Sequence, residues 1–231
     1  EGRFVLFGKP WIWDAYYQKG LTDSSETAFN ITSKARFAAA LDAIVDPATG
    51  RPACRSTVQV DPDNGCVPYN PMGVGVNSPA VLDYILGSPH RDQTFTQEVA
   101  AATLRSSPFD VRAGPVSIAL GVERREEQVD GSSDPISQRN GWFAGNYLPT
   151  FGRYHVAEAF LETVVPLAKD RPGARALDLN AAIRRTDYST SGLVSTWKIG
   201  ATWRPIDDLR LRITRSRDIR APNLNELFAA G

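Results

Sequence analysis

The chain has 231 residues, of which 42% are hydrophobic, and its 26 basic and 26 acidic residues give a formal net charge of zero. This balance gives no electrostatic reason to expect binding to nucleic acid, so no nucleic-acid partner is expected. The sequence contains no apolar run approaching the roughly 18 residues that predict a membrane-spanning helix. Strands that cross a membrane need only ~9–11 alternating residues, so composition leaves a β-barrel open.

The first segments of the chain already predict strands. Residues 4–7 are apolar and lead into a turn at Gly8-Lys9-Pro10. Residues 11–30 then predict one long strand, because aromatic and small apolar side chains alternate with polar ones. No secretory signal precedes these strands, and the sequence ends on Ala229-Ala230-Gly231 without a stop signal. We therefore expect a fragment of a larger protein.

A long insertion, residues 33–92, interrupts the strand pattern with two predicted helices. The first is predicted by the helical spacing of Phe37, Leu41, Ile44 and Val45, with Ser33 as N-cap, and the pattern stops at Pro47 and Gly50. The second is predicted over residues 78–86, with Ser78 as N-cap and Pro79 in the first turn.

Cys54 and Cys66 lie between these helices, in a segment rich in Pro, Gly, Asp and Asn. Two cysteines this close in a polar loop indicate a disulfide in an oxidising compartment, and a pair of free thiols is the alternative. A bridge would stabilise the fold by on the order of 3 kcal/mol. Neither His90 nor His155 lies at ligand spacing from the cysteines, so we expect no metal and no other cofactor.

Six further strands follow the insertion. They are predicted over residues 94–104, 116–129, 154–168, 177–184, 197–204 and 209–214. In the last three, apolar residues beginning at Leu177, Trp197 and Leu209 alternate with polar ones, which predicts one apolar and one polar face. Residues 106–115 predict a turn, and residues 130–153 predict a second long loop.

The connections between strands sort by length. The two long ones, residues 33–92 and 130–153, are separated by two strands and therefore lie on the same rim. The short turns lie on the opposite rim, at Gly8 and residues 106–115, 169–174 and 205–208. Outer-membrane barrels sort their loops in this way, whereas a soluble sandwich has no reason to. The sequence thus predicts an all-β fold, a partial antiparallel transmembrane β-barrel of about eight strands with a long, partly helical extracellular loop.

The alternative is a secreted all-β carbohydrate- or ligand-binding module. In that module Trp197 and Ile199 would face a packed interior, whereas a barrel would turn them toward lipid and Lys198 toward the lumen. The candidate lumen-facing residues are Glu158, Glu162, Arg184, Lys198, Arg210 and Arg212. Such residues either contact a plug or an anionic substrate, or form a solvated wall.

The sequence does not support an enzyme. Glu158 and Glu162 share one face of a strand, but strand rise places them about 13 Å apart, beyond the separation of glycosidase carboxylates. Asp187, Tyr188 and Ser189 have no histidine nearby in the sequence to complete a catalytic triad.

The residues after the last strand carry a family resemblance. Arg220-Ala221-Pro222-Asn223 is followed by Glu226-Leu227-Phe228, and this order resembles the barrel of TonB-dependent outer-membrane receptors. The resemblance extends to Glu158–Glu162, Asn180–Arg184 and Thr196–Gly200. It implies a 22-strand barrel in the bacterial outer membrane, closed by an N-terminal plug. It also implies uptake of a scarce substrate, such as a siderophore or an oligosaccharide, with energy passed on by TonB.

On this resemblance, residues 1–231 are an incomplete barrel domain without the plug and the C-terminal strands. The implied partners are outer-membrane lipid, the plug, a small-molecule or oligosaccharide substrate, and the TonB complex through the missing N-terminal part. We expect the motif to order the outer rim, with Arg220 paired to Glu226. The candidate loop aromatics, which could grip substrate or pack the loops, are Tyr69, Trp142, Phe143 and Tyr147.

Overall fold

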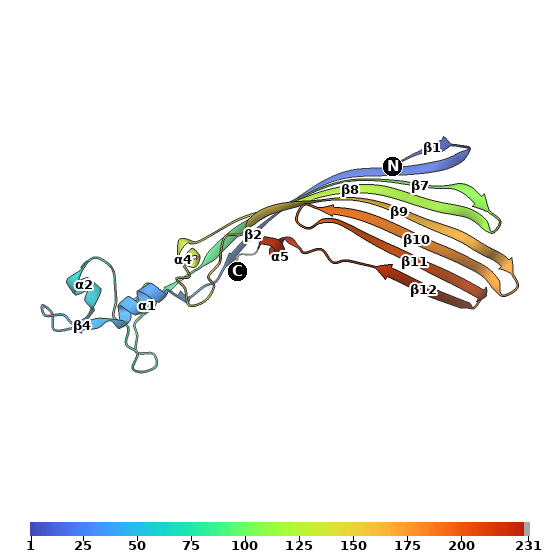
Figure 1. Ribbon diagram of the computed structural model, residues 1–231. Coiled ribbons are helices and arrows are strands. Elements are labelled where there is room, and N and C mark those ends of the chain that lie inside the picture. Colours follow the sequence, from blue (N-terminus) through green and yellow to red (C-terminus); the bar gives the residue numbers. More distant parts are fainter. Residues whose placement is uncertain (229–231) are drawn as a thin grey trace. The chain divides into compact units, whose positions relative to one another are not determined.

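The computed structural model describes residues 1–228 and is dominated by one eight-stranded sheet (Figure 1). Its strands are β1 (Gly2–Leu6), β2 (Lys9–Thr27), β7 (His90–Val111), β8 (Gly114–Ser133), β9 (Phe151–Arg171), β10 (Ala174–Tyr188), β11 (Gly192–Ile206) and β12 (Leu209–Arg217). Each lies beside the main-sheet strand that precedes it in the chain, in the order β1-β2-β7-β8-β9-β10-β11-β12. The predicted antiparallel all-β fold is confirmed. No helix among the described residues is long and apolar enough to cross a bilayer.

The connections fall into two classes according to the end of the strands that they join. Two-residue turns at 7–8, 112–113, 172–173 and 207–208 join strands at one end. At the other end the main-sheet strands are separated by residues 28–89, 134–150 and 189–191. Long and short connections are thus sorted, as outer-membrane barrels require, with the exception of the short third connection.

The turn predicted over residues 106–115 was too wide. β7 continues to Val111 and β8 begins at Gly114, so only two residues separate the strands. The hydroxyl of Ser106 donates to the carbonyl of Pro10 at 2.8 Å, and the Ser107 and Ser117 hydroxyl oxygens lie 3.4 Å apart. Cross-strand bonds of this kind keep residues with turn propensity inside the ladder.

The register of the last four strands aligns their apolar residues into rows. Ile183 lies opposite Trp197 and Leu161, and Leu179 lies opposite Ala201 and Val165. The rows continue into β12 through the pairs Trp203–Leu211 and Ala201–Ile213. On the other face, Ala182 lies opposite Lys198 and Glu162.

No second sheet covers these apolar rows within residues 1–228, where the remaining sheets are two-stranded. Ile183 and Ile213 are 51% and 74% exposed. A binding module of the sandwich type would bury these side chains between stacked sheets. The sandwich alternative is therefore wrong.

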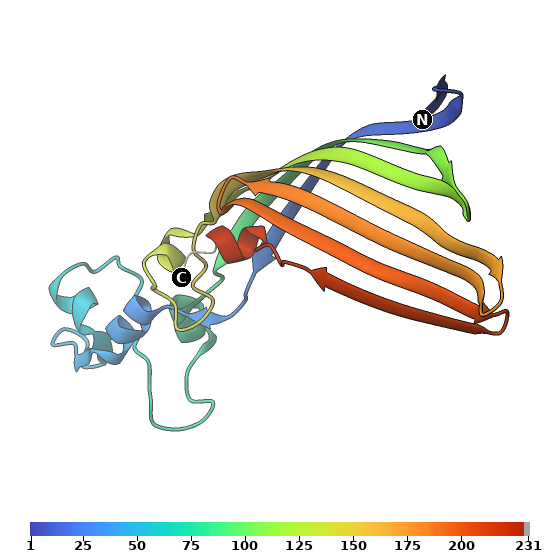
Figure 2. The ribbon, with the colours of Figure 1, turned by 45° about the vertical axis from the view of Figure 1, so that its right-hand side comes forward.

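The chain divides into two compact units. The sheet unit comprises residues 1–22, 95–129 and 152–228, and contains most of the main sheet together with α5 (Leu224–Phe228). Figure 2 shows the curvature of its strands. The insertion unit comprises residues 23–94 and 130–151, and so contains the two long connections with the strand ends that lead into them.

The insertion unit consists of short elements. They are β3 (Ile31–Thr32), α1 (Lys34–Leu41), β4 (Ala43–Val45), β5 (Pro52–Cys54), α2 (Arg55–Gln59), α3 (Pro79–Ile85), β6 (Leu86–Gly87) and α4 (Pro135–Gln138). Both predicted helices are present, as α1 and α3, but α1 ends at Leu41, and Ile44 and Val45 lie in β4 rather than in the predicted helix. Ser33 accepts a hydrogen bond from the N–H of Arg36 at 3.5 Å, whereas Ser78 occupies the N-cap position of α3 without a side-chain bond. The predicted disulfide between Cys54 and Cys66 is also confirmed.

Candidate functional site

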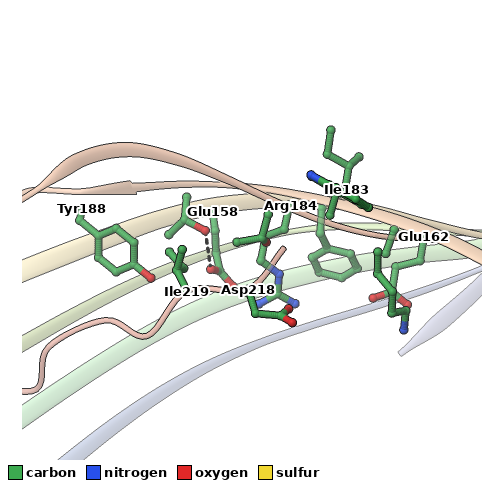
Figure 3. A pocket seen from close by; sticks show the side chains of 13 residues that line it. Glu158, Glu162, Ile183, Arg184, Tyr188, Asp218 and Ile219 are labelled. Atoms are coloured by element: carbon green, nitrogen blue, oxygen red, sulfur yellow. Dashed lines mark hydrogen bonds and ion pairs between the residues drawn. The ribbon is translucent and has the colours of Figure 1, made fainter. Parts of the chain in front are cut away.

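A hollow of about 320 Å³ on the polar face of the sheet unit gathers side chains from β9, β10 and β11. Glu158 accepts a hydrogen bond from the Arg184 guanidinium at 2.9 Å and one from the Thr186 hydroxyl at 3.2 Å. Arg184 also lies over the ring of Phe160, 5.4 Å from its centroid. Glu158 and Arg184 point to the same side of the sheet, whereas Ile183 points to the other (Figure 3). Strand alternation has therefore placed a charged network on the face opposite the apolar rows.

The structure brings together most of the predicted lumen residues. Glu158, Glu162, Arg184 and Lys198 all line the hollow. Arg212 lies on β12 opposite Thr202, so it shares the polar face without reaching the hollow, and Arg210 precedes it on the same face of that strand.

Other side chains of the hollow were missed by sequence reasoning. Phe160, Thr186 and Tyr188 lie two or four residues from predicted members on the same strand, so alternation alone could have identified them. Asp218 and Ile219 follow β12 and also line the hollow (Figure 3). No periodicity marks these two, because they lie beyond the end of the strand.

The motif after β12 forms a capped helical turn, α5. The side chain of Asn223 accepts a hydrogen bond from the N–H of Glu226 at 2.9 Å, and the Glu226 carboxylate accepts one from the N–H of Asn223 at 3.0 Å. This reciprocal pair is a capping box. Arg220 pairs with the same carboxylate, as predicted, and its hydrogen bond lowers the pKa of Glu226.

α5 packs against β9 through its last residue. A methyl group added at Gly152 would overlap the ring of Phe228. Gly152 is an even-numbered residue of β9, like Glu158, so the ring lies on the polar face of the sheet. The motif thus ends on the face that carries the charged hollow. Its remaining residues are Ala221, Pro222 and Leu227.

In the insertion unit, Asp134 organises a buried polar network around Trp142. The carboxylate of Asp134 accepts bonds from the Trp142 indole at 3.1 Å, from the N–H of Ser137 at 2.9 Å and from the N–H of His90 at 3.2 Å. Burial alone would raise the pKa of Asp134, but the bonds from Ser137, Trp142 and His90 outweigh burial and lower the pKa to about 2. Trp142 is only 4% exposed. This aromatic residue therefore packs the second long connection into the insertion unit.

The other predicted aromatics occupy different surroundings. Phe143 is 60% exposed and meets the ring of Phe37 edge-on at 5.8 Å, while Tyr69 meets the same ring at 5.1 Å. The Tyr147 hydroxyl donates to Glu26 at 3.0 Å. Their contact with a substrate stays a prediction, and of the four only Phe143 is largely exposed to solvent.

The charged hollow offers binding groups of both signs beside an aromatic ring. Glu158 is committed to Arg184 and Thr186, which suits a recognition surface better than a free catalytic acid. Among residues 1–228, no group of three His, Cys, Asp or Glu side chains lies close enough to hold a metal ion.

Comparison with protein families gives one match, to the family described as TonB dependent receptor-like, beta-barrel, over residues 10–231. Neither the curated proteins nor the solved structures give a match.

Proposed function

Because the chain belongs to the TonB-dependent receptor β-barrel family, we propose that it forms part of an outer-membrane receptor that imports a scarce small molecule or oligosaccharide with energy from TonB. The proposal extends the family's general role, that of an outer-membrane receptor and transporter, to a TonB-energised uptake step. It involves no covalent chemistry: substrate binds to the outer connections and the polar face, and rearrangement of a plug opens a path.

The observation that carries the proposal is the uncovered apolar face of β9 to β12. Its rows are in register across four strands, and their large side chains are exposed. Water-soluble proteins rarely expose apolar surface on this scale, whereas a barrel strand must present it to hydrocarbon. The polar face, with its charged hollow, would then line the lumen and face the plug and passing substrate.

Cysteine labelling tests which face meets lipid. Cys54 and Cys66 are bonded to each other, so within residues 1–231 an introduced thiol is the only free one, and the parent receptor without an introduced cysteine gives the background labelling. In the full-length receptor in outer membranes, we expect Lys198→Cys to react with a water-soluble maleimide and Ile199→Cys to resist it. These neighbouring residues of β11 differ only in face, which makes each the control for the other. Equal reaction of the two thiols would contradict the lipid-facing assignment.

Uptake assays test the transport step. Cells that depend on the receptor for a candidate siderophore or oligosaccharide should lose uptake when either the receptor or TonB is removed. Uptake that persists without TonB would reject the energised mechanism while leaving the membrane assignment intact.

A further inference from the structure

A shallow groove of about 600 Å³ lies on the exposed face of the sheet unit, beyond the apolar rows. Small side chains of β7 and β9 form its floor. They are Ala100, Ala102, Ala157 and Ala159. Val122 of β8 and Leu193 of β11 add apolar surface, so the groove offers a smooth, mostly hydrocarbon floor. Its volume lies within the range of ligand sites in proteins.

Strand register fixes the face on which this groove lies. Arg185 lies directly opposite Ala159, and it follows Ile183, the last apolar row residue of β10, by two positions. On β8 and β9, the hydrogen bond between the Tyr154 hydroxyl and Glu127 at 2.7 Å assigns odd residues of β8 and even residues of β9 to the polar face. The groove's floor residues on β9 are odd, so they lie on the same face as the apolar rows.

Two arginines flank the alanine floor. Arg124 follows Val122 by two positions on β8, and Arg185 lies on β10, so strand spacing separates their backbones by roughly 10 Å with β9 between them. Within residues 1–228 neither guanidinium has an ion pair or a hydrogen bond. Arg184, by contrast, lies on the polar face and is paired with Glu158.

The carboxylates around the groove do not neutralise these arginines. Glu123 and Glu158 border it but belong to the polar face, where each pairs with an arginine of that face. Asp187, opposite Ala157, is the one carboxylate of the groove lining on the groove's own face, so the lining keeps one positive charge in excess. Glu126, two positions beyond Arg124 on the same face of β8, lies outside the lining.

We propose that the groove binds a phosphorylated lipid of the outer leaflet, with an acyl chain along the alanine floor and a phosphate between Arg124 and Arg185. This inference rests on the proposed function, because the apolar rows must face hydrocarbon and the long connections must lie outside. Arginines at the end of an apolar row then stand at headgroup depth, where a guanidinium binds phosphate through paired hydrogen bonds. Unpaired arginines on a lipid-facing surface would otherwise lack a counter-ion.

Binding of diphosphoryl lipid A to the purified full-length receptor in neutral detergent tests the site. We expect the double variant Arg124→Gln/Arg185→Gln to bind about tenfold more weakly or worse, because basic residues at a membrane surface each add to the attraction of anionic lipid. The matched control, Arg210→Gln/Arg212→Gln, removes the same charge from the polar face and should leave affinity unchanged. Ala159→Phe, which fills the groove and keeps both arginines, should also weaken binding, whereas Asp187→Asn should strengthen it.

Several results would overturn the inference. Unchanged affinity in Arg124→Gln/Arg185→Gln, or an equal loss in the control, rejects the two arginines as the site. Full competition by inorganic phosphate identifies a simple anion site, and equally tight binding of phosphatidylcholine rejects selection of an anionic lipid. Labelling at Ile199→Cys separates the two proposals. If that thiol is protected while lipid affinity is unchanged in Arg124→Gln/Arg185→Gln, only the lipid site fails.

Discussion

The insertion unit and the last four strands of the sheet unit use apolar side chains in opposite ways. The insertion unit buries them, as at Ala40, Cys54 and Trp142, and adds a disulfide. The strands β9 to β12 expose theirs in rows, as at Ile199 and Ile213. A region that stays in water must supply its own core, whereas a region in a bilayer is held by backbone pairing and lets lipid cover its apolar side chains.

Removing Trp142 should give the largest effect, and it should be confined to the insertion unit. Trp142→Ala leaves a cavity at a buried position and removes one hydrogen-bond donor to the Asp134 carboxylate. We therefore expect the stability of the insertion unit to fall by about 3–5 kcal/mol. Phe143→Ala, at the exposed neighbouring residue, is the control and should cost under about 1 kcal/mol. Hydrogen exchange of residues 134–146 in the full-length receptor measures both. Equal protection in the two variants would mean that Trp142 does not hold the connection.

The stability of the sheet unit should depend on which face carries an added charge rather than on the loss of side-chain volume. Ala181 and Ala182 are neighbours on β10, the first opposite Ile199 in an apolar row and the second opposite Lys198 on the polar face. Ala181→Arg should destabilise the folded barrel by about 2–4 kcal/mol, because it places a charge in hydrocarbon, and Ala182→Arg should have little effect. Urea titration of the receptor in bilayers, followed by heat-modified gel mobility, measures the difference. Similar losses in both variants would show that the two faces do not meet different solvents.

Much of the sheet unit could be predicted from the sequence because the alternation of side chains along a strand is a local property. Alternation assigned Ile183 and Lys198 to opposite faces without knowledge of any distant contact, and the register agrees. The network of Asp134 and Trp142 could not be found in this way, since it joins the second long connection to His90, the first residue of β7, 44 positions before Asp134 in the sequence. Asp218 was missed for the same reason, because only the path of the chain after β12 brings it to the hollow.

Acid should weaken the insertion unit selectively through Asp134. The folded pKa of about 2 lies below the ordinary value of 3.8, so the unfolded chain takes up a proton at higher pH than the folded one. The stability from this carboxylate is therefore complete above about pH 4 and is lost as pH falls toward 2. Asp134→Asn should remove this pH dependence and cost about 2 kcal/mol at neutral pH, the range of hydrogen bonds to a charged group.

Pepsin cleavage between pH 4 and pH 2 provides the measurement for Asp134, since the protease is active across that window. We expect cleavage within residues 134–150 to increase steeply in the wild type and to be high throughout in Asp134→Asn. A wild-type cleavage rate that stays flat across the window would rule out Asp134 as the acid-sensitive group.

The smallest expected effect concerns α5, where charge and capping can be separated at one residue. Glu226→Gln keeps an acceptor for the N–H of Asn223 but loses the ion pair with Arg220, which is exposed to solvent and therefore contributes little to stability. Glu226→Ala loses the capping bond as well and should destabilise α5 further. The N–H of Leu227, which donates to the Asn223 carbonyl at 3.0 Å, reports the helical turn by hydrogen exchange. If both variants expose that amide equally, the ion pair rather than the cap holds α5, and the motif would order the segment through charge alone.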